Sequence, residues 1–272
     1  MRSRPADPDP VELDAGTIVA IAVVAWAVTT LLHEGLGHGG ACVLVGGVPR
    51  LVTSAYFDYD EGSVSAAAVR VISAGGTLVN LAVGIPLSLV ARLVIAPRLR
   101  LVVWLLAAFN LTTGFGYFLY SGIGGIGDWR VVIAGLPSEG AWRIAEIVAG
   151  AFGYFVLAPR LLWPAILPLI GGGSDRVRRA RMLTLVPYLV AGGLALASGA
   201  LNPLGMEIML ISSAAAAFGG TSLLAWYFAM LADKRPDASA AGIGIPRSIK
   251  WWVAAALAVA VFVGVFGPGL TL

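Results

Sequence analysis

The sequence predicts an all-α polytopic membrane protein of about seven transmembrane helices (range six to eight), with a short β-hairpin between the first two helices. Three observations predict it. Hydrophobic residues make up 58% of the chain and charged residues 12%, about half the charge of a soluble domain. The mean hydropathy is +0.88. The charges lie between long uncharged runs, and most of these runs reach the roughly 20 residues that a spanning helix needs.

The first helix is expected from Asp14 to about Val45, where Gly46, Gly47 and Pro49 end it. The segment 51–59 is rich in β-forming residues and is followed by an Asp60-Glu61-Gly62 turn, which favours a hairpin. Further helices are expected at residues 66–96, 99–121, 142–157, 182–201, 206–232 and 249–267. Pro159, Pro164 and Pro168 predict an irregular continuation of the fourth helix to Gly173.

Basic residues predict the orientation, because cytoplasmic loops carry an excess of Lys and Arg. With the N-terminus inside, twelve basic residues fall in cytoplasmic segments and three in outer loops. We therefore expect a multi-pass protein with a cytoplasmic N-terminus and an external C-terminus, in contact with the lipid bilayer and not with nucleic acid. The ends of the first and third helices and the start of the second then lie toward one side of the membrane, so that polar residues far apart in sequence can meet.

The first helix ends in His33-Glu34-Gly35-Leu36-Gly37-His38, which contains both histidines of the chain. Ionisable groups at membrane depth are costly and usually functional, and His and Glu on one helix are typical zinc-hydrolase residues. Residues five apart on an α-helix point about 140° away from each other. Two geometries allow a metal site. A π-bulge would bring His33 and His38 together, with Glu34 as base; alternatively, Glu34 and His38 are the ligands. We favour the π-bulge.

A catalytic zinc site needs three protein ligands and an open position. With no further histidine in the chain, the third ligand should be a carboxylate. Asp128 is the leading candidate, since it follows a Gly-rich break at the end of the third helix. Lesser candidates are Glu139, Asp58, Asp60, Glu146 and Glu207. The simpler interpretations are that Asp128 is a loop acid paired with Arg130 and that the histidines are polar contacts between helices.

The single cysteine, Cys42, excludes an intramolecular disulfide and is expected to be a packing residue.

These motifs resemble those of the site-2 protease family of intramembrane zinc metalloproteases. That family carries H-E-x-x-H in its first core helix, and His33 to His38 is similar with one residue more. Its second core helix has a segment like A-G-P-x-x-N, which Ala74 to Asn80 resembles. Its third core helix carries an Asn and then an Asp, to which Asn110 and Asp128 correspond. The resemblance covers residues 15–130.

The resemblance implies that His33, His38 and Asp128 bind Zn²⁺ and that Glu34 deprotonates the zinc-bound water. It also implies that Asn80, and with it Asn110, hydrogen-bonds the substrate backbone or the oxyanion. By this interpretation the chain divides into a disordered cytoplasmic tail (1–14), a metalloprotease-like core (15–135) and accessory helices of the same membrane domain (136–272).

Three functions are compatible with these features. The first is cleavage of a membrane-anchored protein, whose unwound segment could add to the edge of the hairpin. The second is a zinc-dependent enzyme that acts on a lipid or small amphiphile. The third is a non-enzymatic metal-binding or transport protein. Small residues at 214–217 and 219–220 suit close helix packing, inside the chain or in a homo-oligomer.

Overall fold

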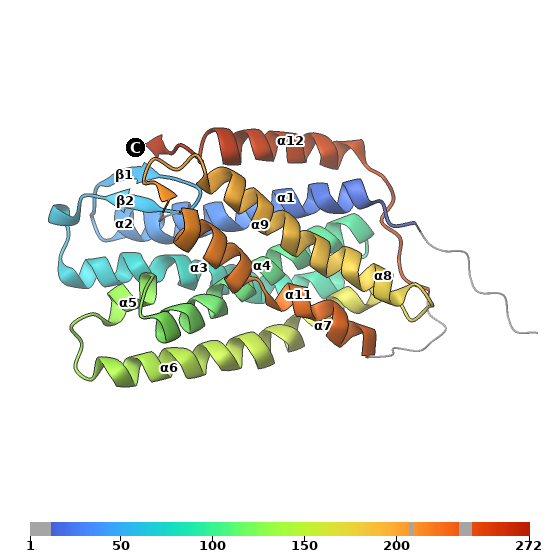
Figure 1. Cartoon of the computed structure of the whole chain (residues 1–272), viewed down its shortest axis with the longest axis horizontal. Helices are drawn as coiled ribbons and strands as arrows, with labels where there is room; N and C mark the ends of the chain where they lie inside the picture. The colour runs from blue at the N-terminus through green and yellow to red at the C-terminus, as the bar shows by residue number, and fades with distance from the viewer. Residues whose placement is uncertain (1–11, 207–208, 234–240) are drawn as a thin grey trace, which may run out of the picture.

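Helices form almost the whole molecule and lie side by side in one elongated bundle (Figure 1). The computed structural model describes residues 12–206, 209–233 and 241–272. The α-helices are α1 (Ala15–Leu31), α2 (Gly40–Leu44), α3 (Ala66–Leu93), α4 (Pro97–Gly124), α5 (Asp128–Ile133), α6 (Glu139–Phe152), α7 (Ala158–Ile170), α8 (Arg176–Ala180), α9 (Val186–Gly199), α11 (Leu223–Asp233) and α12 (Ile249–Gly264). The π-helical segments are η1 (Leu32–Gly39), η3 (Gly153–Leu157), η4 (Arg181–Leu185) and η5 (Met209–Gly220).

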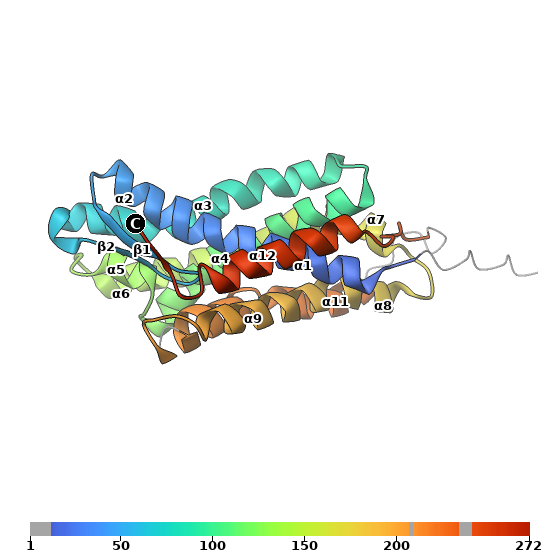
Figure 2. The same ribbon diagram turned by 90° about the horizontal axis from the view of Figure 1, so that it is seen from above.

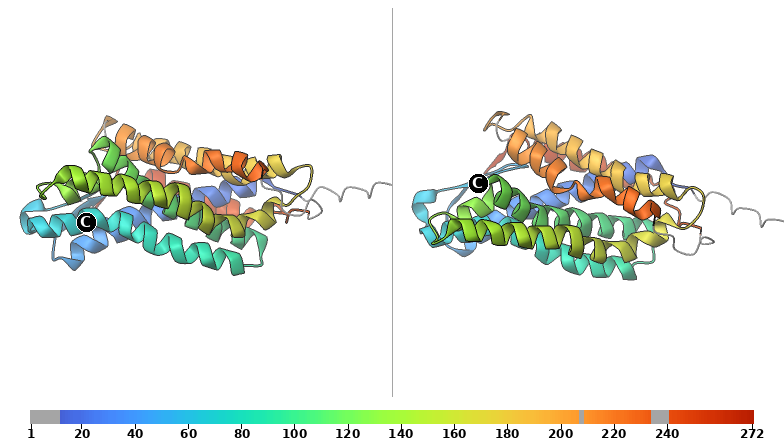
Figure 3. Two further views of the ribbon diagram at one scale, coloured as in Figure 1. Left: turned by 90° about the horizontal axis from the view of Figure 1, so that it is seen from below. Right: turned by 60° about the horizontal axis from the view of Figure 1, so that its bottom comes forward.

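Among the described residues, five continuous helices are long and apolar enough to cross a membrane. They comprise residues 15–44, 66–93, 97–124, 139–170 and 176–199. The apolar α12 is shorter, and the predicted helix over 206–232 is divided here into η5 and α11, with 207–208 outside the described residues. Seen from above and from below, α3 lies on one flank of the bundle and η5–α11 on the other (Figures 2 and 3). These five helices agree with the predicted membrane protein in length and composition, whereas the count of seven stays a prediction.

The first helix begins at Asp14, whose carboxylate accepts hydrogen bonds from the backbone N–H of Thr17 at 2.7 Å and from its hydroxyl at 2.6 Å. Such a cap satisfies one of the free N–H groups at a helix start. Leu13 forms an isolated parallel bridge with Ile245, whose carbonyl accepts from the Asp14 N–H. Most of the predicted disordered tail lies outside the described residues, but positions 13 and 14 are anchored to the C-terminal part of the chain.

The predicted hairpin is present, and a third strand completes a small sheet. Strands β1 (Pro49–Val52) and β2 (Phe57–Tyr59) pair antiparallel, and β3 (Leu270–Thr271) pairs with the other side of β1. The chain reverses at residues 53–56, where the Thr53 N–H donates to the Tyr56 carbonyl at 2.8 Å. Residues 61–63 form a single 3₁₀ turn after β2. The sheet caps the end of the bundle where η1 and α5 also lie (Figure 1).

The three prolines were predicted to make the continuation of the fourth helix irregular. The irregularity is limited to the π-helical turn η3, and α6, η3 and α7 form one continuous helix from Glu139 to Ile170. The π-helical turn of η3 ends two residues before Pro159. A proline clashes with the carbonyl of the residue four positions earlier, and a widened turn relieves that clash. The η4 turn ends at the same distance before Pro187. The widened turns therefore let the helices continue through Pro159 and Pro187, whereas Pro164 and Pro168 lie inside α7 without such a turn.

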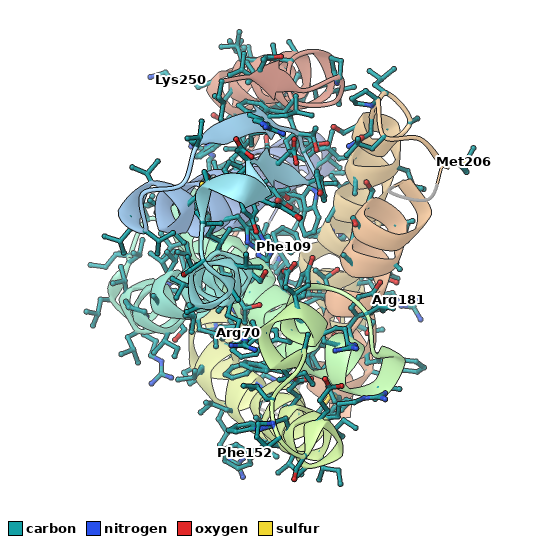
Figure 4. The ribbon with its side chains drawn as sticks, turned by 90° about the vertical axis from the view of Figure 1, so that its left-hand side faces the viewer. Arg70, Phe109, Phe152, Arg181, Met206 and Lys250 are labelled. Carbon is teal, nitrogen blue, oxygen red and sulfur yellow. The ribbon has the colours of Figure 1, made fainter. Side chains whose placement is uncertain are left out.

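The core lies between α1 and α4, at the centre of the bundle viewed from the sheet end, where Phe109 is labelled (Figure 4). Phe109 contacts Trp26 edge to face, with ring centroids 5.4 Å apart. A Cβ at Gly116 of α4 would lie 3.1 Å from Gly220 of η5, and Ala217 is 1% exposed. Part of the small-residue stretch therefore packs inside the chain; a homo-oligomer stays a prediction.

Candidate metal centre

The two histidines lie on η1, a π-helical segment, and their side chains meet. A π-helix closes hydrogen bonds between residues five apart and so places such residues on one face. The Nε2 atoms of His33 and His38 are 3.3 Å apart, and the rings are nearly perpendicular, with centroids 4.9 Å apart. The interpretation with a π-bulge is therefore the one that fits the geometry.

Asp128, the first residue of α5, completes a group of three buried or half-buried side chains that could hold a metal ion. Its Oδ2 atom lies 3.6 Å from His33 Nε2 and 3.4 Å from His38 Nε2. Oδ2 is buried and has no hydrogen-bond partner among the described residues. Figure 1 shows α5 beside the bundle end that carries the sheet, where the ends of η1 and α4 and the start of α3 lie. The sequence predicted this convergence.

The spacing of the three atoms fits a zinc ion. When ligands bind zinc tetrahedrally at about 2.0–2.1 Å, neighbouring ligand atoms are about 3.3–3.4 Å apart. The three measured separations are 3.3, 3.4 and 3.6 Å. His33, His38 and Asp128 could therefore hold a metal ion with little movement. The identity of the metal does not follow from this spacing alone.

Hydrogen bonds fix which nitrogen of each ring carries the proton. His38 Nδ1 is 2.8 Å from the carbonyl of Ile72 on α3; a carbonyl only accepts, so this nitrogen carries the proton. The Nδ2 group of Asn110 donates to the Leu106 carbonyl at 2.8 Å, so its Oδ1 faces Asn80 and accepts from Nδ2 of that residue at 2.8 Å. Asn80 Oδ1 is then left to accept from His33 Nδ1 at 2.5 Å.

Both neutral imidazoles therefore present the unprotonated Nε2 to the other ring and to Asp128. Three atoms that carry lone pairs face one another at 3.3–3.6 Å, an arrangement that repels unless a cation or an added proton lies among them. Burial acts to raise the pKa of Asp128, but when the rings carry an added proton, the charge of His38 and hydrogen bonds from both rings outweigh burial and hold this pKa well below its usual value. In that state the carboxylate is ionised, which is also the form that a metal ligand needs.

Glycines allow α3 to approach close enough to support the rings. A Cβ at Gly76 would lie 2.5 Å from His33 Cε1 and 2.7 Å from His38 Nε2. A Cβ at Gly75 would overlap the backbone of Gly37, and one at Gly37 would lie 2.5 Å from the Gly76 Cα. The backbones of η1 and α3 are therefore in direct contact beneath the metal-binding atoms. Only residues without a side chain fit at this crossing.

Asn80 and Asn110 were predicted to contact substrate, but the structure gives them another position. Both side chains are fully buried, and neither lines the cavity beside the histidines. Their amides form a chain from the Leu106 carbonyl to His33, and Asn110 also donates to the Thr29 hydroxyl at 3.1 Å. Such partners fix the orientation of a ligating histidine and raise its basicity. The hydrogen bonds of Asn80 and Asn110 therefore favour a role in positioning His33 over a role in binding substrate.

A cavity of about 420 Å³ opens beside the three ligand atoms. Glu34, His38 and Asp128 line it together with Tyr117, Tyr120 and residues 55–57 of the hairpin region. Tyr117 also stacks on His33, with ring centroids 5.0 Å apart; sequence reasoning missed both tyrosines, because an aromatic residue in an apolar helix carries no distinguishing signal. Glu34 thus faces the same space as two of the metal-binding side chains.

The other carboxylates proposed as third ligands lie elsewhere. Asp60 pairs with Arg50 at 3.1 Å and Glu139 with Arg130 at 3.5 Å, so Arg130 does not pair with Asp128. The remaining candidates, Asp58, Glu146 and Glu207, fall outside the metal-binding group: the first is on β2, the second is buried on α6, and the third is outside the described residues.

Comparisons of the chain with family models, with curated proteins and with solved structures found no match.

The glycine crossing predicts that Gly76→Ala weakens zinc binding by about 10–100-fold, the range found when supporting residues around a metal are altered. The added methyl group would displace both rings. Isothermal titration with zinc in detergent measures the effect. Gly35→Ala is the matched control, because it lies on the same π-helical segment and its Cβ would meet nothing within 4 Å. Equal affinities of the two variants would contradict the placement of α3 against the rings.

The amide chain predicts that Asn110→Leu lowers zinc affinity by about 10–100-fold although Asn110 touches neither metal-binding atom. Loss of Asn110 leaves Asn80 free to turn its amide, and His33 Nδ1 then loses its acceptor. Thr112→Val is the control: this buried neighbour donates to the Ala108 carbonyl and has no contact with the chain of amides. If Asn110→Leu and Thr112→Val bind zinc equally well, the tautomer assignment for His33 is wrong.

Proposed function

We propose that this chain is an intramembrane zinc metalloprotease of the site-2 protease type, which cleaves a membrane-anchored protein. The observation that carries the proposal is the triangle of ligand atoms, with sides of 3.3, 3.4 and 3.6 Å, next to a glutamate in the same cavity. The two histidines of this chain are five residues apart, one more than in the H-E-x-x-H motif of the family. In a π-helix, residues five apart lie on one face, as residues four apart do in an α-helix. The extra residue is therefore compatible with the family's arrangement of ligands.

His33 Nε2, His38 Nε2 and Asp128 Oδ2 would hold the ion. A bound zinc ion supplies Lewis-acid chemistry, polarising a carbonyl and lowering the pKa of a coordinated water to about 7. Glu34 is the base: its carboxylate faces the cavity and is the group of η1 left to accept a proton from the nucleophilic water and to return it to the leaving amine. Tyr117 shields one face of His33.

The sheet supports a peptide substrate. Strand β3 occupies one side of β1, so β2 is the outer strand on the other side, and in the described residues no strand pairs with its far edge. Phe57 and Tyr59 of β2 line the cavity beside the metal-binding atoms. An extended substrate segment could add to this edge by main-chain hydrogen bonds and so reach the site with its peptide groups satisfied, as burial in a membrane requires.

We further propose seven crossings, with the N-terminus in the cytoplasm and the C-terminus outside. The start of α1 and the end of the chain lie at opposite ends of the bundle (Figure 1), which an odd number of crossings requires. Five helices are long and apolar enough to cross; η5–α11 and α12 would supply the other two crossings. The metal centre then lies toward the outer face, near the end of the bundle that carries the sheet.

A second candidate is a zinc-dependent enzyme that acts on a lipid. An apolar groove of about 360 Å³ lies next to the site cavity and shares Tyr117 and Tyr120 with it. A helix about 10 Å in diameter would fill this volume in less than one 5.4 Å turn, so the groove suits an acyl chain better than a helical substrate. This groove is the observation that favours a lipid.

Zinc content tests the metal centre directly. We expect about one zinc ion per chain in the purified protein, and its loss in His38→Ala and in Asp128→Ala, because two ligands alone bind zinc weakly. Asp58→Ala is the control carboxylate, on the strand β2 outside the metal-binding group, and should retain zinc. Inductively coupled plasma mass spectrometry measures the ratio. Full zinc retention in His38→Ala would refute the site.

Glu34→Gln separates the two enzymatic functions. The variant should bind zinc as the wild type does but lose hydrolysis by at least about 100-fold, the size of a general-base contribution. In cells, uncleaved membrane proteins should then accumulate, which comparative proteomics of the membrane fraction can detect. If lipid profiles change and no protein fragment differs, the protease proposal is wrong and the lipid enzyme takes its place.

A further inference from the structure

A second, smaller cavity lies behind the metal centre, where α1, η1, α4 and η5 meet. It has a volume of about 40 Å³ and is lined by Trp26, Thr113, Ser213, His33 and Glu34 among others. Glu34 and Tyr117 also line the larger cavity. The side chain of Glu34 therefore borders two spaces, the larger cavity beside the three ligand atoms and this smaller one between the helices.

The lining of the small cavity contains three polar atoms that no described residue satisfies. Trp26 Nε1, Thr113 Oγ1 and Ser213 Oγ are buried and lack a hydrogen-bond partner, and their residues are only 6%, 8% and 4% exposed. A buried polar atom without a partner costs about 1–3 kcal/mol. Three such atoms from three different helices converge on one space, which packing alone does not explain.

We propose that this cavity is a hydration site whose ordered water positions Glu34. A buried water needs about 10–15 Å³ and two to four polar partners; the cavity supplies about 40 Å³ and three unsatisfied atoms. Water held by the indole N–H and the two hydroxyls can donate to the Glu34 carboxylate, which accepts no direct hydrogen bond from the described residues. An apolar ligand does not fit this set, because it would leave all three polar atoms unpaired.

The consequence for function rests on the proposed hydrolase. A base on a helix surface with no hydrogen-bond partner can turn among rotamers, whereas catalysis needs it held in one geometry. Water in the small cavity would fix one carboxylate oxygen and leave the other toward the larger cavity. Trp26, Thr113 and Ser213 are then positioning residues for Glu34, although none of them borders the cavity beside the metal.

Radiolytic labelling tests the hydration site without any need for zinc or substrate. X-rays convert bound water into hydroxyl radicals, which oxidise the adjacent side chains, and mass spectrometry measures the rate. Trp26 should oxidise several-fold faster than Trp104, a fully buried tryptophan whose Nε1 donates to the Leu162 carbonyl at 2.9 Å. Ser213→Val, which fills the cavity, and the isosteric Thr113→Val, which removes one water ligand, should both slow the oxidation of Trp26.

Equal oxidation of Trp26 and Trp104 in the wild type, or an unchanged Trp26 rate in both variants, would overturn the proposal. Zinc content measured on the same samples separates this outcome from failure of the proposed function. A labelled Trp26 in a protein that binds no zinc would refute the hydrolase and leave the hydration site intact. Full zinc occupancy with an unlabelled Trp26 would refute the hydration site and leave the proposed hydrolase intact.

Discussion

Repulsion among three lone-pair-bearing atoms is the constraint on which the functional end of this molecule depends. His33 Nε2, His38 Nε2 and Asp128 Oδ2 face one another at 3.3–3.6 Å in a buried setting. Two backbone carbonyls, Ile72 directly and Leu106 through two asparagines, force the protons of both rings onto Nδ1. The surrounding helices thus hold together three atoms whose mutual repulsion only a metal ion or an added proton relieves.

Close packing makes this arrangement possible. The π-helical turn of η1 brings the two histidines to one face, and the glycine crossing of Gly37 with Gly75 and Gly76 lets α3 supply the Ile72 carbonyl and the Asn80 amide at hydrogen-bonding distance. The break after α4 turns the chain so that Asp128 approaches from the third side. Each contribution comes from a different helix, so the site exists only in the assembled bundle.

Much of this arrangement was predictable from the sequence. Long uncharged runs predicted membrane helices, and the five-residue spacing of the histidines predicted either a π-bulge or a different ligand pair. The small sheet was half predicted: β1 and β2 follow from local β-forming residues, but β3 comes from the far end of the chain, and no local pattern reveals such a pairing. The continuous helix through Pro159 was missed because the relief comes from a widened turn, which leaves no mark in composition.

The positions of Asn80 and Asn110 show a different limit of sequence reasoning. An amide in a membrane helix suggests a polar task, but its partners depend on helix rotation, which hydrophobic patterning does not define when a helix is buried on most sides. The structure turns both amides toward His33 and away from the cavity. Likewise, only the packed bundle reveals that Glu34 borders both the cavity beside the three ligand atoms and the smaller one lined by Trp26, Thr113 and Ser213.

Crystals grown with zinc, with diffraction recorded on both sides of the zinc absorption edge, would test the central claim most directly. The account predicts a single strong anomalous peak bonded to Nε2 of His33, Nε2 of His38 and a carboxylate oxygen of Asp128, at about 2.0–2.2 Å from each. No peak among these atoms, with the His38 imidazolium hydrogen-bonded to Asp128 in its place, would show that a proton and not a metal reconciles the three groups.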